Sequence, residues 1–523
     1  GNEDAVTFLR SVFDLVIKEG VERVKDASTP VIDFKNPEEL EQILDLKIPM
    51  QSSSHDQLLH YCEQVFKYSV KTAHPHFFNQ LYAGLDPYGF AGQVVTDVLN
   101  TSIYTYEVAP VFVLMEKYLL RHVRQLIGYE GGDGTFSPGG SYSNMLGMNL
   151  ARFNKFPQVV RVGMRGLPRI VAFVSSQSHY SNKKNAALLG IGIDDVIPVA
   201  TDNCGRMLTS DLKRKIEESK EEVSILSNVC LVLLNVLYHC VINYQMLISL
   251  WFTIMIRWNG AVPFLVVGTC GTTVLGAFDP VDEIADICQD NNIWLHIDAA
   301  WGGGVLLSSK HRHLCKGIHR SDSVAWNPHK MMMAPLQCCI FVTKHDSVMK
   351  NCQSIQVPYL FQPDKTLYSP EYDIGSKVIQ CGRKVDVFKL WLMMKAHGNI
   401  GLESRINKAF DNAQYLAELV KKTDGFKLVC DVSPECTNVC FWYLPKRLRK
   451  LEWRLDDKAF CQKVAAVPPI VKEKMTTSGS LLVGYQPLAG MPSFFRMVVI
   501  NDELTKSDMH FVINEIDKLG QDI

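Results

Sequence analysis

The sequence predicts an α/β protein built on a mostly parallel, doubly wound sheet. Short continuous apolar runs predict strands that are buried on both faces, at 170–175, 264–270 and 293–299. Segments with a helical pattern separate these runs, among them the charged stretch 211–222 and the stretch 281–289 after Pro280. Because strands alternate with helices along the chain, we expect parallel pairing with helices on both faces of the sheet.

The ends of the chain have a different pattern. We expect three parts: a helical N-terminal segment at 1–100, a large sheet domain at 101–385 and a small α+β domain at 386–523. The first part carries amphipathic helices expected at 4–24 and 37–72. The last part carries helices expected at 385–397 and 401–422 and strands expected near 426–430 and 437–443. A chain of 523 residues is long enough to bury more than one core.

Composition and charge narrow the class of function. The formal net charge is −1, so no overall field steers the chain toward nucleic acid or an acidic membrane surface. The 15 cysteines show no spacing typical of a disulfide framework or a metal site. The first ten residues lack the basic start and apolar run of a secretory signal. We therefore expect a cytoplasmic protein without a metal, which binds a small molecule or a protein partner.

Polar residues follow several of the predicted strands, and the carboxyl ends of a parallel sheet are where such folds bind ligands. Residues 137–141, SPGGS, lead into a helical run. The free N–H groups at such a helix start bind phosphate, although a plain turn would have the same sequence. Asp298 lies at the end of an apolar strand, where it can pair with a cationic ring nitrogen or cap a helix.

Lys330 and His179 belong to the same group of candidates. Lys330 ends the run NPHK at 327–330, which lies between Trp326 and three methionines. Partial desolvation there would make the amine a better Schiff-base former, whereas an exposed lysine is the ordinary alternative. His179 follows the strand at 170–175, where it can stack on an aromatic cofactor or simply stay solvated.

Taken together and in this order, these residues resemble the group II pyridoxal-phosphate decarboxylases, in the branch that holds glutamate, cysteine sulfinate and acidic amino acid decarboxylases. The similarity extends over nearly the whole chain, and its most specific strings are WNPHK at 326–330 and HIDAAWGG at 296–303. It implies the type I, aminotransferase-like fold of pyridoxal-phosphate-dependent transferases, with pyridoxal 5'-phosphate as cofactor. It also implies a homodimer with the active site at the subunit interface.

The resemblance assigns a role to each matching residue. Lys330 carries the cofactor covalently, Asp298 keeps the ring nitrogen protonated, and His179 stacks on the ring. Tyr359 matches a tyrosine that protonates the carbon from which CO₂ leaves. Gly382 matches a glycine that reaches the phosphate of the neighbouring subunit. Further contacts to the cofactor are expected from Gly140, Ser141, Thr273, Ala300, Asn327 and His329.

The resemblance also implies a small acidic amino acid as substrate. Arg496 matches the arginine that binds the distal acid, a task that suits a guanidinium because it forms two parallel hydrogen bonds, and Gln80 matches its partner. Tyr82 matches a position that is aromatic in the sulfinate and aspartate branch and small in glutamate decarboxylases. We therefore expect cysteine sulfinate or aspartate. One methylene is worth only about 1–3 kcal/mol of discrimination, and residues 361–364 and Pro335 look more like the glutamate branch, so glutamate is the alternative.

The segment 223–259 departs from the family pattern. It is mostly apolar, and Arg257 is its only residue among Lys, Arg, Asp and Glu. It is long enough for a membrane span, but a span would thread one connection of the sheet domain through a bilayer. We interpret it as translated non-coding sequence; an inactive or membrane-held protein is the alternative of another class. An aldehyde-forming reaction is disfavoured, because His179 and Tyr359 match plain decarboxylases.

Overall fold

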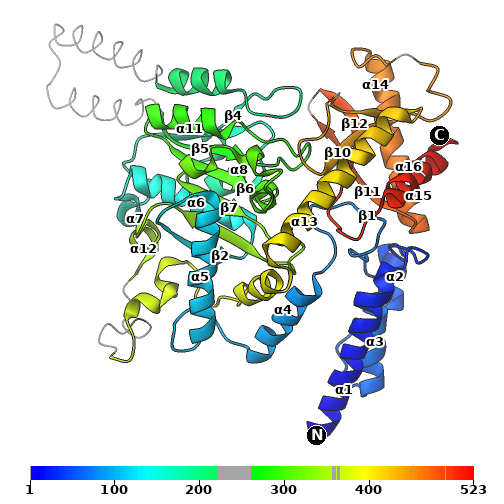
Figure 1. The fold of residues 1–523 in the computed structure, drawn as a ribbon, viewed down its shortest axis with the longest axis horizontal. Coiled ribbons are helices and arrows are strands. Elements are labelled where there is room, and N and C mark those ends of the chain that lie inside the picture. The colour runs from blue at the N-terminus through cyan, green and yellow to red at the C-terminus, as the bar shows by residue number, and fades with distance from the viewer. Residues whose placement is uncertain are drawn as a thin grey trace. The chain divides into compact units, whose positions relative to one another are not determined.

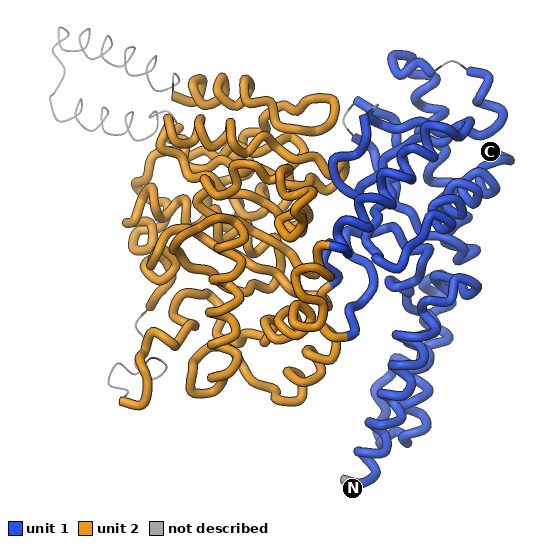
Figure 2. Tube along the Cα trace, in the orientation of Figure 1, with its two compact units in different colours: residues 1–87, 330–333, 404–523 blue, residues 88–329, 334–403 orange. Residues whose placement is uncertain are grey.

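The chain forms two compact units (Figure 2). Unit 1 comprises residues 1–87, 330–333 and 404–523, and unit 2 comprises residues 88–329 and 334–403. The computed structural model describes residues 2–220, 261–355, 361, 366–430, 432–451, 453–488 and 490–523. Tyr359 and the segment 223–259 therefore lie outside the described residues. The three-part division of the chain stays a prediction.

Unit 2 contains a sheet of seven strands in the order β2-β8-β7-β6-β5-β3-β4 (Figure 1). Among the described residues, β8 is antiparallel to both of its neighbours, and the other pairings in this sheet are parallel. The prediction of a mostly parallel α/β sheet is thus confirmed. The strands are β2 (Asp133–Ser137), β3 (Ile170–Ser175), β4 (Val196–Val199), β5 (Val262–Thr269), β6 (Trp294–Ala299), β7 (Ser323–Trp326) and β8 (Cys339–Thr343).

Helices pack on the strands of this sheet. Helix α6 (Gly140–Lys155) lies across β5, β6, β7 and β8, and its Leu146 and Leu150 share a hydrophobic core with Phe264 of β5. Helix α11 (Val281–Asp290) packs against β5 and β6. The charged stretch expected at 211–222 is helical over 209–220, where the described part ends. The other helices of this unit are α4 (Pro87–Leu99), α5 (Pro110–Ile127), α7 (Val159–Val162), α8 (Ser181–Leu188) and α12 (Val348–Gln353).

The strand order creates a place for a ligand. From β3 the chain moves to one edge at β4, then returns to β5 on the other side of β3 and continues away through β6 and β7. The progression therefore reverses between β3 and β5. In open α/β sheets, ligands bind beyond the carboxyl ends of the strands at such a reversal. The loops that follow β3, β5, β6 and β7 all begin at this edge of the sheet.

Unit 1 is built around a smaller sheet in the order β1-β11-β12-β10-β9. Strand β1 pairs with β11 in parallel, and the other pairings are antiparallel. The strands are β1 (Phe77–Phe78), β9 (Phe426–Leu428), β10 (Asn438–Tyr443), β11 (Leu482–Leu488) and β12 (Met491–Val498). Three helices close to the sheet in sequence are α14 (Lys458–Ala465), α15 (Val467–Ser478) and α16 (Lys506–Gly520). The long helix α13 (Val387–Lys422) belongs to both units, with residues 387–403 in unit 2 and residues 404–422 in unit 1. It is broken at Gly398, between the two helices predicted for this stretch.

The predicted helix at 37–72 is wrong as a single element. It consists of α2 (Pro37–Ile43) and α3 (His55–Tyr68), each with its own capping box, at Asn36 and at Ser54. Pro49 between them disfavours helical backbone at the residue before it. The helix predicted at 4–24 is α1 (Asn2–Leu15) followed by a wider π turn at Val16–Glu22. Among the described residues, no helix is both long and apolar enough to cross a membrane.

Candidate active site

Asp298 lies near the carboxyl end of β6 and is 5% exposed. Its Oδ2 accepts a hydrogen bond of 2.8 Å from the Nδ2 of Asn144 on α6. Its Oδ1 accepts one of 3.0 Å from the backbone N–H of Ala300. Two N–H donors, one on each oxygen, are the pairing that an ionised carboxylate requires, since it can only accept. The structure therefore buries a carboxylate at the predicted end of the sheet.

His179 is joined to Asp298 through two intermediate side chains. The Ser181 hydroxyl, in the first turn of α8, lies 2.8 Å from the Nδ1 of the half-buried His179. Asn144 donates its second amide hydrogen to the same hydroxyl, at 3.3 Å. Because Asn144 also binds Asp298, one hydrogen-bonded group connects the loop after β3 with the end of β6.

The start of α6 is suited to an anion. No side chain caps this helix end, so its first N–H groups are available to a ligand. A Cβ placed on Gly139 would meet nothing within 4 Å, whereas one on Gly140 would lie 2.6 Å from the Nδ2 of Asn327. Asn327 is buried, and its Oδ1 has no hydrogen-bond partner among the described residues. Ser141 is exposed at the same helix start.

The loop that carries Thr273 is tied to the segment after Asp298. The backbone N–H of Cys270 donates to the carbonyl of Asp298 (2.9 Å), and the N–H of Gly302 donates to the carbonyl of Cys270 (2.9 Å). Thr273 itself is half-buried, and Ala300 is buried. The loops after β5 and β6 therefore run side by side in unit 2.

Lys330 and His329 follow β7. The Nδ1 of His329 donates to the carbonyl of Cys338 (2.8 Å), which fixes the orientation of the imidazole. Lys330 is half-buried and begins the short segment 330–333 that belongs to unit 1. Its backbone carbonyl accepts from the N–H of Met333 (3.1 Å), which closes a turn.

Gly382 lies in an exposed part of unit 2, and a Cβ there would meet nothing within 4 Å. Its neighbour Arg383 is buried and holds the segment in place. The guanidinium forms an ion pair with Glu116 (2.7 Å) and donates to the carbonyl of Ile103 (2.8 Å) and the hydroxyl of Thr135 (2.9 Å). An exposed glycine is therefore presented by a rigidly anchored chain.

The residues expected to bind the substrate acid lie in unit 1. Arg496 is on β12 and only 8% exposed, and its guanidinium donates to the backbone carbonyl of Asn79 (3.2 Å). Burial lowers the pKa of Arg496. A second cation, Lys472 on α15, donates to the Oδ1 of Asn79 (3.0 Å), and burial lowers the pKa of Lys472 to about 8. Two desolvated cations thus flank the residue that precedes Gln80. Gln80 is exposed, and Tyr82 is 37% exposed.

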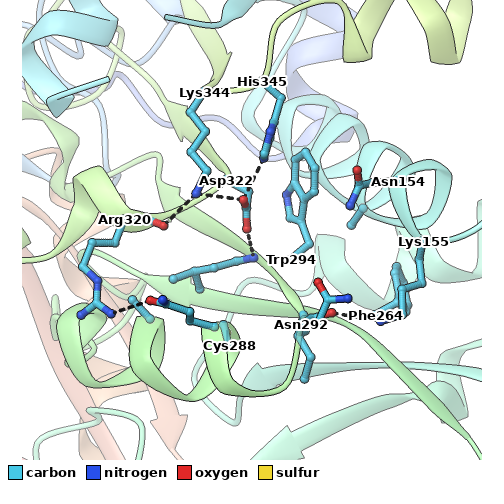
Figure 3. Close-up of a pocket in the computed structure, with 15 residues that line it drawn as sticks. Asn154, Lys155, Phe264, Cys288, Asn292, Trp294, Arg320, Asp322, Lys344 and His345 are labelled. Atoms are coloured by element: carbon cyan, nitrogen blue, oxygen red, sulfur yellow. Dashed lines mark hydrogen bonds and ion pairs between the residues drawn. The ribbon is translucent and has the colours of Figure 1, made fainter. Parts of the chain in front are cut away.

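A cavity of about 310 Å³ in unit 2 lies at the opposite end of the strands (Figure 3). Trp294 at the start of β6 lines it, together with Asp322, which precedes β7. Asp322 pairs with Lys344 (3.0 Å) and His345 (2.8 Å), so these charges are already matched. None of the predicted site residues that the structure describes lines this cavity.

Comparison with known proteins identifies the family. The sequence matches the family described as pyridoxal-dependent decarboxylase conserved domain over residues 37–236 and 252–444. This chain belongs to the pyridoxal-dependent decarboxylases. It is therefore an amino acid decarboxylase with pyridoxal phosphate as cofactor. The family match is interrupted at 237–251, inside the segment that the sequence sets apart.

Individual decarboxylases resemble this chain over nearly its full length. The cysteine sulfinic acid decarboxylase of Homo sapiens is 48% identical over 516 residues, which cover 98% of this chain and 96% of the relative. The acidic amino acid decarboxylase of Bos taurus is 46% identical over 517 residues, covering 99% and 91%. The crystal structure of mouse CSAD superimposes with a TM-score of 0.88 at 46% identity, covering 100% of both chains.

The described residues of unit 2 fit pyridoxal phosphate. The uncapped start of α6 beside Gly139 has the donors and the open space that a phosphate needs. The buried Oδ1 of Asn327 lacks a partner within the described chain and can accept one from a ligand. The carboxylate of Asp298 suits the protonated ring nitrogen of this decarboxylase cofactor.

The residues behind Asp298 were not predicted from the sequence. Asn144, Ser181 and His296 were not among the candidates, yet they hold Asp298 and His179 in position. One signal was present in the sequence: His296 lies two residues before Asp298 in a strand, so both side chains point to the same face.

Proposed function

We propose that this decarboxylase acts on a short acidic amino acid, cysteine sulfinate or aspartate, and releases CO₂ from its α-carbon. The observation that carries the proposal is the buried Arg496, with Lys472 beside it, next to the segment of Gln80 and Tyr82. A buried guanidinium suits an anionic substrate group, because it can bind a carboxylate or sulfinate through two parallel hydrogen bonds. The names of the relatives at 46–48% identity support the same class of substrate.

The proposed cofactor roles follow from the polar groups described above. Lys330 would hold pyridoxal phosphate covalently, and Asp298 would keep its ring nitrogen protonated. When bound, the cofactor supplies an electron sink for the pair of electrons left on the α-carbon as CO₂ departs. His179 would cover the ring. The phosphate would be held by Gly140, Ser141, Asn327 and His329, with Thr273 and Ala300 lining the ring.

The remaining roles concern the substrate and the assembly. Tyr359, which lies outside the described residues, is proposed to protonate the α-carbon. We further propose a cytoplasmic homodimer, in which the exposed Gly382 contacts the cofactor of the partner subunit. An exposed glycine on an anchored segment allows a close backbone approach, because no side chain intervenes.

Replacing Arg496 tests the acid-binding role. Arg496→Gln should lower kcat/KM for cysteine sulfinate by about 10- to 100-fold, since a charge-assisted hydrogen bond is worth about 1.5–3 kcal/mol. Arg496→Lys, which keeps the charge but not the paired geometry, should lose less. The control is Arg449→Gln, a half-buried arginine of unit 1 that pairs with Asp517. Equal kcat/KM in Arg496→Gln and Arg449→Gln would rule the role out.

Replacing Tyr82 tests the choice between acids. Tyr82→Ser should raise the ratio of kcat/KM for glutamate over aspartate by about 10-fold or more, because removal of the ring makes room for one methylene. Tyr485→Ser is a matched control, because Tyr485 is also 37% exposed. Tyr485 pairs with Phe495, whereas Arg496 pairs with Gly484, so Tyr485 faces away from Arg496. An unchanged ratio in Tyr82→Ser would show that Tyr82 does not limit the length of the substrate.

A further inference from the structure

Behind Asp298, unit 2 contains a continuous chain of buried hydrogen bonds. The Nε1 of Trp294 lies 3.0 Å from the Oγ of Ser323, which in turn lies 2.8 Å from the Nδ1 of His296. The Nε2 of His296 lies 3.1 Å from the Oδ1 of Asn144. The Nδ2 of Asn144 then donates to Asp298 (2.8 Å). We name these four side chains the buried relay: Trp294, Ser323, His296 and Asn144.

The groups at the two ends of the buried relay restrict the proton positions within it. Trp294 can only donate, so the Ser323 oxygen accepts from its Nε1. At the other end the carboxylate of Asp298 can only accept, so the amide nitrogen of Asn144 must face it. The amide oxygen of Asn144 then faces His296, which must donate from Nε2. If His296 is neutral, its one proton is therefore on Nε2, its Nδ1 accepts from the Ser323 hydroxyl, and all four hydrogen bonds point toward Asp298.

The local sequence builds this arrangement. Trp294, His296 and Asp298 alternate along β6 and share one face of the sheet. Ser323 of β7 is the register partner of His296, which places its hydroxyl beside the imidazole. Helix α6 covers this face, and it can approach closely because Gly147 has no side chain: a Cβ there would lie 2.6 Å from the Nδ1 of His296.

The neutral state of His296 has a physical cause. Burial lowers the pKa of His296 to about 4, against the opposing effects of the nearby Asp298 and of a hydrogen bond with the backbone of Ser323. At neutral pH the ring therefore carries no charge and one N–H. An uncharged relay aligns dipoles toward the carboxylate without forming an ion pair with it, so the charge of Asp298 stays available to the cofactor.

We propose that the buried relay is a positioning device for Asp298, in which Asn144 orients the carboxylate and aligned donors stabilise its charge. Asn144 also donates to Ser181, which contacts His179, so the same amide couples the positions of the two residues that would hold the cofactor ring. The inference rests on the proposed role of Asp298. It assigns Asn144, His296 and Ser323 to positioning, since none of them has to touch the substrate.

Two substitutions and one matched control test the buried relay. Asn144→Leu should lower kcat by about 10- to 100-fold, the usual loss when the partner behind a functional ligand is removed. It should also weaken the binding of pyridoxal phosphate, measured by equilibrium titration of the cofactor-free protein. Ser323→Ala should lower kcat by about 3- to 10-fold, the value of one hydrogen bond. The control is Ser321→Ala.

Ser321 is a close match to Ser323. It is equally buried, and its hydroxyl also contacts an aromatic polar group, the hydroxyl of Tyr129 at 2.6 Å. Its hydroxyl makes no hydrogen bond to the four described side chains of the buried relay, so Ser321→Ala should change the melting temperature but not kcat. If Ser323→Ala and Ser321→Ala have the same kcat, the proposal is wrong. The comparison of these two serine variants tests the proposal even if Asn144→Leu does not fold.

The proton order can be measured without turnover. In cofactor-free protein labelled with ¹⁵N-histidine, the signal that disappears in His296→Gln should show a protonated Nε2 and an unprotonated Nδ1. A protonated Nδ1, or a charged ring at neutral pH, would overturn the proposed order. If Asp298→Asn loses activity while Asn144→Leu keeps it, the positioning role of the buried relay is wrong and the proposed role of Asp298 is supported. If Asp298→Asn keeps its activity, the role of Asp298 fails instead, and the ¹⁵N signal still reports on the proton order.

Discussion

Lys330→Ala is expected to abolish decarboxylation, with a fall in kcat of more than about 1,000-fold, the scale seen when a covalent catalytic group is removed. Alanine has no amine to bind the cofactor aldehyde or to release the product. Borohydride treatment of the wild-type protein should attach pyridoxal phosphate covalently to the peptide that contains Lys330. The same treatment of the variant should leave no stoichiometric amount of cofactor attached to the chain.

Because Lys330 is only half-buried, its truncation should leave the melting temperature of the cofactor-free protein nearly unchanged. Lys155→Ala is a suitable control, since Lys155 is also half-buried and its amine donates to the backbone carbonyl of Asn292 (3.0 Å). Lys155→Ala should keep both activity and the labelled Lys330 peptide. Retained activity in Lys330→Ala, with cofactor fixed on another lysine, would show that the assignment is wrong.

Asp298→Asn is expected to reduce kcat by about 100- to 10,000-fold. A neutral amide cannot stabilise a protonated ring nitrogen as a carboxylate does. The structure adds a second cost: both oxygens of Asp298 accept from N–H groups, of Asn144 and of Ala300. The amide nitrogen of the variant is itself a donor, so it would face one of these N–H groups and neither would have an acceptor. A buried donor without an acceptor costs about 1–3 kcal/mol.

The control for Asp298→Asn is Asp322→Asn. Asp322 also accepts several hydrogen bonds, from the backbone of Leu295 (2.8 Å) and from His345, but it lies at the other end of the strands. Asp322→Asn should lower the melting temperature without changing kcat, whereas Asp298→Asn should lower kcat far more than stability. Near-normal turnover in Asp298→Asn would show that the electron sink does not depend on Asp298.

The central sheet could be predicted because its strands are buried on both faces. The run at 170–175 is β3 itself, and the run at 293–299 differs from β6 by one residue. Such strands carry a continuous apolar signal that depends on little beyond the chain itself. The helix predicted at 37–72 was wrong although the signals for its interruption are local: Pro49 disfavours helix before it, and Ser54 with Gln57 forms the capping box that starts α3.

The candidate site could be predicted only where the type of residue and its neighbours in the sequence indicate its chemistry. Asp298 after an apolar strand and Lys330 after NPH point to a cofactor, and the resemblance assigned their roles. Asn144 and Ser323 gave no such signal, since buried asparagines and serines are common and their function depends on register partners far apart in the sequence. The contribution of α6 to the site was likewise visible only in its packing on β6.

The most direct test of the proposed function is a parallel assay of three acids. Purified protein loaded with pyridoxal phosphate would be given cysteine sulfinate, aspartate and glutamate at equal concentrations, and the initial rate of CO₂ release and the amine products would be measured. We predict hypotaurine or β-alanine as the main product, with glutamate slower by about 10-fold or more, as one extra methylene beside Tyr82 implies. Fastest release from glutamate, or no CO₂ from any of the three acids, would contradict the proposal.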